Sequence, residues 1–316
     1  MQGLHRIRNA DETKPPHGYP DWKHFSNWNF INLAVRLKFE SPIEWSPEVP
    51  PNIERLTGIE YRRVGDRSLQ LDIYRPRGLS VPVPALIFIH GGYWQRGKRS
   101  DYARYLVDFA AKGYITASVD YRLSGEAHFP AAVEDVKCAV KWIRAHAADY
   151  MIDPEHLVCI GGSAGGHLAM MAAWSPDSAF SGDGCSRDSV SGRVQAVVDL
   201  YGPVDLTTRF FTADSMVSRF IGKSYQETPP LYEMASPRKY ISADDPPVLI
   251  MHGTLDINIP VSQSDSLKIW LDAAHVPNEY HRIPGWAHTM DGVESMNRYY
   301  QSRMDAFFQK YVPLPK

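Results

Sequence analysis

Short, continuous apolar runs alternate with helical patterns along most of this chain. Apolar runs of this length are typical of strands buried on both faces of a parallel sheet. Residues 131–147 instead repeat apolar positions at helical spacing, which predicts a long amphipathic helix. This alternation predicts an α/β fold with a mostly parallel central sheet and helices on both faces. The predicted buried strands are 85–89, 115–119, 157–160, 194–200, 248–251 and 279–283.

The alternation of strands and helices is preceded by a predicted hairpin and ends in a predicted helix. Residues 59–64 and 68–74 predict an antiparallel hairpin around Gly65-Asp66, and residues 294–311 predict the last helix. We therefore expect a catalytic domain over 56–316, with a lid-like insertion at 201–245 where prolines and short helical pieces interrupt the rhythm. Residues 1–55 form a separate N-terminal segment. Its aromatic-rich helical stretch, 21–38, either patches the body of the domain or caps a pocket.

Composition narrows the range of functions. The chain has 316 residues, of which 44% are hydrophobic and 22% charged, as expected for one large globular domain. The formal net charge of −2 favours neither nucleic acid nor an anionic membrane surface as a partner. We find neither an 18-residue apolar stretch nor a secretory leader, so we expect no membrane span and a cytoplasmic location. The sequence leaves open whether the chain forms a homodimer.

The three cysteines are too few for a disulfide framework. Cys138 falls on the predicted amphipathic helix and Cys159 on a predicted core strand, so both are expected to be small buried apolar groups. The sequence contains no HExxH pattern, CxxC pair or dinucleotide fingerprint, so we expect no metal and no cofactor.

Candidate chemistry centres on a serine. The predicted strand 157–160 runs into a G-x-S-x-G pattern at 161–165, and a helical run follows. A serine on such a strand-to-helix turn needs glycine neighbours, and the turn lifts its hydroxyl above the sheet. The pentapeptide alone is a weak signal, so Ser163 is a candidate nucleophile only if a base and an acid accompany it.

Both partners occur after later strands, in the order serine, acid, histidine. Asp256 follows the strand 248–251, and His288 follows the strand 279–283. Functional groups of parallel sheets gather at the carboxyl ends of strands, which favours these two as the catalytic acid and base. His252 also lies at a strand tip but precedes the acid. The rival acids Asp205, Asp244 and Asp245 fit less well, since the last two precede their strand.

A third element follows the strand 85–89. Two glycines after His90 would let backbone N–H groups point at the oxyanion that forms during acyl transfer. The expected oxyanion-hole donors are Gly92, Tyr93 and Ala164, with Gly91 as an alternative to one of them. His90 is expected to brace the loop. Trp94 is a candidate substrate-binding residue, although a ring of this kind is more often ordinary core.

With these residues in place, the chain resembles the α/β-hydrolase family, and within it the HGG-type esterases related to hormone-sensitive lipase and to bacterial feruloyl esterases. The resemblance runs from about residue 70 to the end and leaves 1–55 unmatched. It departs at Tyr93, where many relatives have a third glycine, and this variant resembles the arylformamidases. The matching pieces are His90-Gly91-Gly92, Asp120-Tyr121-Arg122, Gly161–His167, His252-Gly253-Thr254-x-Asp256 with Ile259-Pro260, and His288.

The sequence therefore predicts a serine carboxylesterase that acts on small-molecule esters of short to medium acyl chains through Ser163, His288 and Asp256. Two related activities stay open: hydrolysis of N-formylkynurenine-type amides, and removal of acetyl or feruloyl groups from plant polysaccharide. A binding module of the same fold is a distant alternative, since such proteins typically lack the serine or the histidine.

Overall fold

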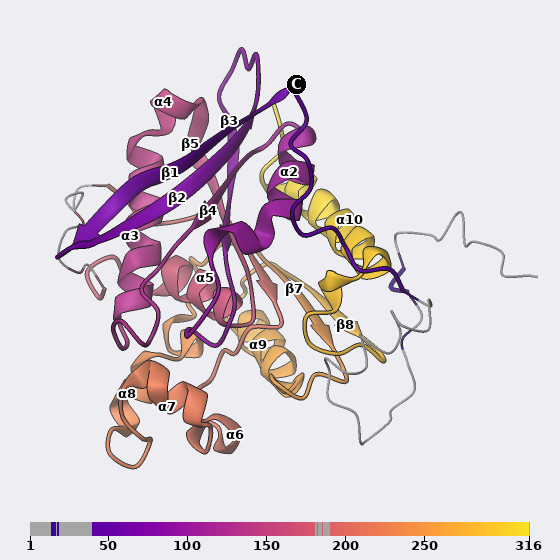
Figure 1. Ribbon diagram of the computed structural model, residues 1–316. Helices are drawn as coiled ribbons and strands as arrows, with labels where there is room; N and C mark the ends of the chain where they lie inside the picture. Colours follow the sequence, from indigo (N-terminus) through magenta and orange to yellow (C-terminus); the bar gives the residue numbers. More distant parts are fainter. Residues whose placement is uncertain are drawn as a thin grey trace, which may run out of the picture.

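The computed structural model describes residues 14–16, 18, 40–180, 182, 185 and 190–315. Eight strands of this part form one sheet in the order β1-β2-β4-β3-β5-β6-β7-β8 (Figure 1). The strands are β1 (Ile53–Val64), β2 (Arg67–Pro76), β3 (Val83–Ile89), β4 (Ile115–Val119), β5 (Ile152–Gly162), β6 (Ala196–Leu200), β7 (Val248–Gly253) and β8 (Asn278–Ile283).

The sheet is mostly parallel, as the sequence predicts. β2 pairs antiparallel with β1 and with β4, and every pairing from β4 through β8 is parallel. The carboxyl ends of β3, β5, β6, β7 and β8 therefore meet at one edge. The loops that carry the candidate residues all leave the sheet at that edge.

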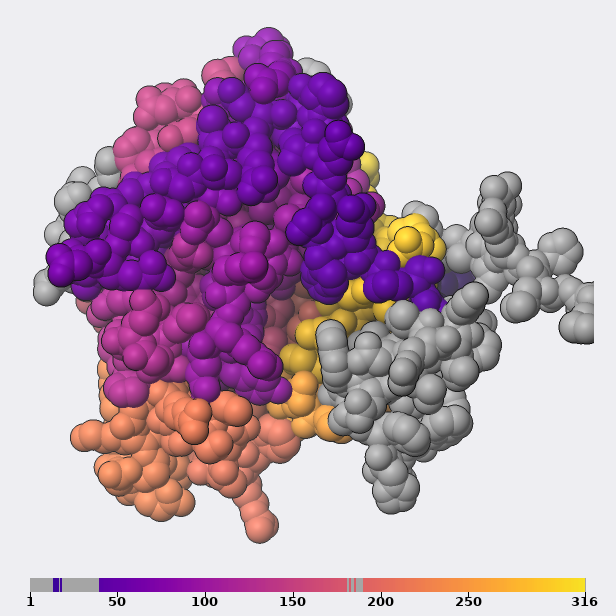
Figure 2. All heavy atoms as spheres, in the orientation of Figure 1, coloured from indigo at the N-terminus to yellow at the C-terminus, as the bar shows by residue number. Residues whose placement is uncertain are grey.

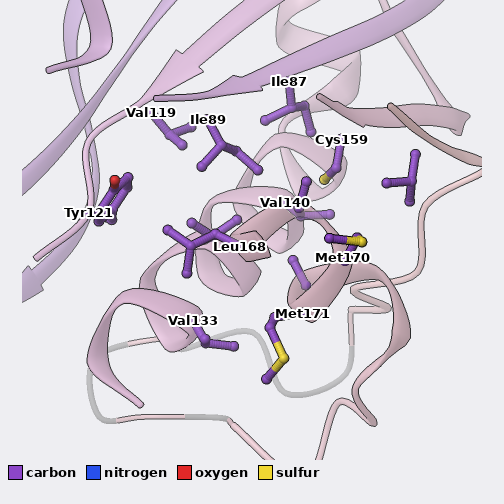
Figure 3. Close-up of a cluster of buried hydrophobic side chains, with 14 of the residues drawn as sticks. Ile87, Ile89, Val119, Tyr121, Val133, Val140, Cys159, Leu168, Met170 and Met171 are labelled. Carbon is purple, nitrogen blue, oxygen red and sulfur yellow. The ribbon is translucent and has the colours of Figure 1, made fainter. Parts of the chain in front are cut away.

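Helices cover both faces of the sheet. Side chains of α3, α5 and α9 pack against one face, and those of α2 and α10 pack against the other. In Figure 3, valines of α3 and the Leu168–Met171 part of α5 lie beneath strand residues such as Ile87 and Ile89. The principal helices are α2 (Ala103–Ala111), α3 (Ala131–Ala145), α4 (Ala147–Tyr150), α5 (Ala164–Trp174), α9 (Ser262–Ala273) and α10 (Glu294–Tyr311). No helix of the described residues is long and apolar enough to span a membrane.

The segment between β6 and β7 holds α6 (Arg209–Thr212), α7 (Ser215–Ile221), α8 (Pro229–Met234) and the 3₁₀ turn η2 (Pro237–Tyr240). It forms the orange lobe at the bottom of Figure 2. These elements fall within the predicted insertion at 201–245, whose bounds and action as a lid stay predictions. The predicted helix at 21–38 lies outside the described residues, so the proposed division at residue 55 also stays a prediction.

The interpretation of Cys138 was wrong. Cys138 on α3 forms a disulfide with Cys185, with 5.6 Å between their Cα atoms, whereas Cys159 is free and buried. Sequence spacing could not reveal this pair, because 47 residues separate its members and only the tertiary structure brings them together. Disulfides persist mainly in oxidising compartments, and the expected cytoplasmic location stays a prediction.

Candidate active site

Ser163 occupies a strained turn between β5 and α5. Its backbone angles are φ 57° and ψ −123°, a conformation that L-residues rarely adopt. The turn requires glycine on both sides: a Cβ at Gly161 would lie 2.3 Å from the carbonyl carbon of Gly165, and one at Gly165 would lie 2.0 Å from the oxygen of Ile89. The backbone N–H of Ser163 donates to Leu200 on β6, at 2.8 Å, and so fixes the turn against the sheet.

His288 and Asp256 lie in contact at the same edge of the sheet. Nδ1 of His288 is 2.6 Å from Oδ2 of Asp256, and both side chains are almost fully buried. Asp256 comes from the loop after β7, and His288 comes from the loop after β8. The pairing places Nδ1–H of His288 on the carboxylate and leaves Nε2 free to accept a proton.

The carboxylate of Asp256 is fully engaged. Its Oδ1 accepts hydrogen bonds from the backbone N–H groups of Asn258 and Ile259, each at 2.9 Å. Its Oδ2 faces His288 and also Nε2 of His252, which lies 3.1 Å away. Burial by itself would raise the pKa of Asp256, but His288 and His252 together hold that pKa well below its usual range. Asp256 therefore stays ionised throughout the pH range in which proteins work.

Ser163 and His288 line one cavity of about 520 Å³. The serine hydroxyl makes no hydrogen bond to any residue that the structure describes, His288 included. Catalytic hydrogen bonds of this kind are often long without substrate and tighten in the complex. The cavity wall combines aromatic rings with charged groups: Trp45, Tyr93, Tyr102 and Tyr201 stand beside Arg96, Asp101 and Asp291.

The loop after β3 approaches the turn of Ser163 closely. A Cβ at Gly91 would lie 2.7 Å from the oxygen of Gly162, and Gly92 has a φ of 110° that suits glycine. Tyr93 and Trp94 both have a φ of 58°, so two bulky residues keep backbone conformations that cost free energy. The hydrogen bonds of the described residues give the N–H groups of Gly92, Tyr93 and Ala164 no protein acceptor. The three predicted oxyanion-hole donors are therefore free for a substrate oxygen.

His90 braces this loop, as the sequence predicts. Its ring stacks on that of Tyr121, with 4.2 Å between centroids, and the Tyr121 hydroxyl donates to the His90 carbonyl at 2.9 Å. Burial lowers the pKa of His90, so the ring is neutral at ordinary pH and does not resemble a second base.

Trp94 belongs both to the core and to the site. Its indole N–H donates to Nδ1 of His167 at 3.2 Å, and its ring stacks on Phe220 of α7 with 4.4 Å between centroids. His167 in turn contacts the Ala235 carbonyl through Nε2, at 2.7 Å. Trp94 thus links the loop after β3 (the candidate oxyanion loop), α5 and the lobe of α6–α8. It also lines a second, much smaller space beside Ser163, of about 10 Å³.

The rival acids do not reach the histidine. Asp205 forms an ion pair with Arg238 in the lobe of α6–α8, and the exposed Asp244 pairs with Arg193. Asp245 binds the backbone of Ser242 before β7.

Two functional features escaped the sequence reasoning. The first is His252, whose contact with the acid could have been suspected from its four-residue spacing to Asp256. The second is a buried network in which the hydroxyls of Tyr105 and Tyr201 donate to the carboxylate of Asp291. The Tyr201 ring lies 4.7 Å from that of His288, so this network borders the candidate base. No local pattern in the sequence marks it.

Behind the nucleophile helix, Asp199 of β6 is fully buried. Its Oδ1 accepts the N–H of Gly202 at 2.9 Å, whereas its Oδ2 has no hydrogen-bond partner among the described residues. A Cβ at Gly166 or at Gly202 would lie 2.4 Å from Oδ1, so two glycines make room for this side chain. Burial raises the pKa of Asp199 to about 8, so the folded protein keeps this carboxyl protonated at pH 7.

We expect Asp199→Asn to stabilise the protein, and more so at higher pH. The unfolded carboxyl ionises near its usual pKa of 3.8 and the folded one near 8, so the unfolded state binds fewer protons between these values. The wild-type free energy of unfolding therefore falls as pH rises through this window, whereas the amide has no such loss. By pH 8 the variant should be more stable by roughly 2–4 kcal/mol. Urea unfolding at pH 5 and pH 8 measures the difference, and a gap that does not widen with pH would contradict the assignment.

The geometry can now be set beside known proteins. Residues 71–271 match the model of the BD-FAE family, which is more than half of the chain. The chain belongs to the BD-FAE family. This confirms the resemblance to α/β-hydrolase esterases of the bacterial feruloyl-esterase type, and the mixed, mostly parallel sheet confirms the predicted fold.

Relatives of this BD-FAE protein carry esterase names. It is 34% identical to the esterase LipQ of Mycobacterium tuberculosis over 72% of this chain, and it spans only 55% of the length of LipQ. A truncated carbohydrate esterase from gut microbiota is 29% identical with a TM-score of 0.72, covering 86% of this chain and 99% of that one. A butyrate-bound thermophilic esterase of Thermogutta terrifontis is 26% identical with a TM-score of 0.71. The match covers 84% of this chain and 97% of the esterase chain.

Proposed function

We propose that this protein hydrolyses carboxylic esters through an acyl-enzyme intermediate. The observation that carries the proposal is the joint placement of three groups: a serine on a strained strand-to-helix turn, a histidine in the same cavity, and a carboxylate on the far nitrogen of that histidine. A hydroxyl becomes a useful nucleophile only when a base takes its proton, and the base works only in the right tautomer. The esterase names of the relatives support the same reaction.

In this reaction Oγ of Ser163 attacks the ester carbonyl while Nε2 of His288 accepts the hydroxyl proton. The tetrahedral intermediate then collapses, the bond to the alcohol breaks, and His288 returns the proton to the leaving oxygen. Water repeats the sequence on the acyl-enzyme and releases the acid. Asp256 keeps His288 in the tautomer that exposes Nε2 and stabilises its cation.

The oxyanion of each tetrahedral intermediate lies against the N–H groups of Gly92, Tyr93 and Ala164. These donors are preorganised by the turn after β3 and by the start of α5, so they need little rearrangement as the charge develops. Loss of one such donor costs about 2.7–4 kcal/mol of barrier in comparable enzymes.

The position of His288 orients the substrate. Because His288 protonates the leaving group, the alcohol lies on its side of Ser163, in the cavity of about 520 Å³. The acyl group then points the other way, into the space of about 10 Å³, which is roughly the volume that one water molecule needs. The polar and aromatic wall of the larger cavity suits a bulky, hydroxylated alcohol. We therefore propose short acyl groups on larger alcohols, with acetyl preferred.

A hydrolysis panel combined with active-site labelling tests this function. We expect p-nitrophenyl acetate and butyrate to be cleaved faster than hexanoate or longer esters, and a fluorophosphonate to label Ser163. An acetylated sugar, a feruloyl ester and N-formylkynurenine in the same panel separate the alternative activities. A folded protein that neither takes the label nor cleaves any of these compounds would refute the proposal and favour a binding module.

We expect Val217→Ala to widen the acyl side and shift the preference toward longer esters. Val217 on α7 is 2% exposed and lines the small space with Trp94 and Phe211. One methylene of pocket room is worth about 1–3 kcal/mol in discrimination, so the ratio of kcat/KM for hexanoate to acetate should rise about tenfold. Val140→Ala, a buried change on α3 away from the site, should leave the ratio as it is. An unchanged ratio in Val217→Ala would place the acyl group elsewhere.

A further inference from the structure

His252 is a second histidine on the catalytic carboxylate. It is the penultimate residue of β7, just before the loop to Asp256, and its side chain is completely buried. Its Nε2 is 3.1 Å from Oδ2 of Asp256, the same oxygen that His288 contacts at 2.6 Å. Its Nδ1 is 2.8 Å from Oγ of Ser264 on α9. The four side chains form a buried chain that runs from α9 to the base.

The partners of His252 determine its tautomer. Nε2 also lies 3.0 Å from the carbonyl oxygen of Ile259, which can only accept a hydrogen bond. Nε2 must therefore carry the proton, and it donates to Ile259 and to Asp256 together. With the proton on Nε2, Nδ1 can accept the hydroxyl proton of Ser264. His252 is in this way fixed as a donor to the carboxylate and cannot serve as a proton acceptor on that side.

Two N–H donors on one carboxylate oxygen divide its negative charge. A hydrogen bond to the ionised form of a carboxylate lowers its affinity for protons, and it lowers equally the attraction that this carboxylate exerts on a neighbouring cation. His252 therefore weakens the hold of Asp256 on the protonated form of His288. With the N–H groups of Asn258 and Ile259 on Oδ1, it also locks the carboxylate in the plane that His288 needs.

Other titratable groups also surround this pair. His288 faces Asp291 of the turn Met290–Gly292 and the ring of Tyr201 after β6, in addition to Asp256. Asp256 interacts electrostatically with Tyr93 of the oxyanion loop and with Tyr300 of α10. Of all these groups, only the two histidines donate hydrogen bonds to Oδ2 of Asp256 among the described residues.

We propose that His252 is a positioning residue that tunes the acid–base pair: its N–H on Asp256 reduces the stabilisation that this carboxylate gives to the protonated form of His288. This inference rests on the proposed ester hydrolysis by Ser163, His288 and Asp256, and it adds a fourth member that acts through the acid without touching substrate.

The test compares His252→Leu with His252→Gln in the full chain. Leucine removes the donor, so the charge on Oδ2 concentrates and the protonated base is stabilised. The acid limb of the kcat/KM profile for p-nitrophenyl acetate should then move to higher pH by about 0.5–1 unit. Glutamine can place its amide nitrogen near the position of Nε2, so its acid limb should stay within about 0.2 units of the wild type. Leu267→Ala, a buried change on α9, controls for lost stability and should not move the limb.

A folded His252→Leu whose acid limb coincides with that of the wild type overturns the proposal, as does a His252→Gln that shifts as far as His252→Leu. If the leucine variant does not fold, ¹⁵N spectra of the wild-type histidines decide instead. They should show His252 as the neutral Nε2–H tautomer, and finding Nδ1–H overturns the proposal. Failure of the proposed function itself looks different, because the wild type would then lack activity that depends on Ser163.

Discussion

Ser163→Ala should abolish ester hydrolysis while leaving the fold intact. Removing the nucleophile of a serine triad lowers kcat by about 10⁶-fold in a well-measured case, and a loss of this order is expected here. The side-chain oxygen of Ser163 makes no hydrogen bond within the described structure, and alanine tolerates the turn no worse than serine. The expected cost in stability is therefore within about 0.5 kcal/mol, as for substitutions that remove no contact.

Hydrolysis of p-nitrophenyl acetate, corrected for the rate without enzyme, measures the loss, and fluorophosphonate labelling should disappear with it. Ser175→Ala is a matched control: Ser175 caps the far end of α5, where its hydroxyl binds the Met171 carbonyl at 2.5 Å, so it should affect stability and leave labelling unchanged. Retention of more than a hundredth of the activity in Ser163→Ala would point to another nucleophile.

The sequence predicts the strands best where both faces are buried. β4 (Ile115–Val119) coincides with its predicted bounds. Every one of its residues is buried, so the apolar run in the sequence begins and ends where the strand does. β5 was expected at 157–160 but extends over Ile152–Gly162, since its first residues include partly exposed polar side chains that give no apolar signal. β1 begins at Ile53, six residues before its predicted start, because one of its edges has no neighbouring strand and most of its residues are partly or fully exposed.

The residues of the candidate site were likewise predictable only where a local sequence signal marks them. Ser163, Asp256 and His288 could be selected because each follows a strand whose carboxyl end must reach the same edge of the sheet. The contacts of the tyrosines around Asp291 and the disulfide of Cys138 depend instead on how side chains distant in sequence pack together. Nothing in a local pattern encodes such packing. His252 lies between these cases: chain order argues against it as the base, and its four-residue spacing to Asp256 is the only sequence signal of the contact that the structure shows.

Asp256→Asn should cost about 10⁴-fold in kcat, the loss seen when the acid of a serine triad becomes an amide. The surroundings of this carboxylate explain why. The oxygen of the new amide would remain on the N–H groups of Asn258 and Ile259, because both can only donate. Its NH₂ group would then face Nδ1 of His288. Nδ1 would then have to accept a hydrogen bond from the amide, so the ring proton would sit on Nε2. With its Nε2 protonated, His288 could not accept the proton of Ser163.

The same NH₂ group would also meet the N–H of His252, a donor facing a donor, so this substitution carries a second penalty. His252 cannot adapt by changing tautomer, because its Nε2–H also serves the Ile259 carbonyl. We therefore expect Asp256→Asn to lose stability as well as activity, by about 1–3 kcal/mol for the unsatisfied donors. Asp244→Asn, the same change on an exposed carboxylate, should match the wild type in both measurements. Less than a tenfold loss of kcat in a folded Asp256→Asn would mean that another group orients His288, and the buried Asp291 beside Tyr201 would be the first to examine.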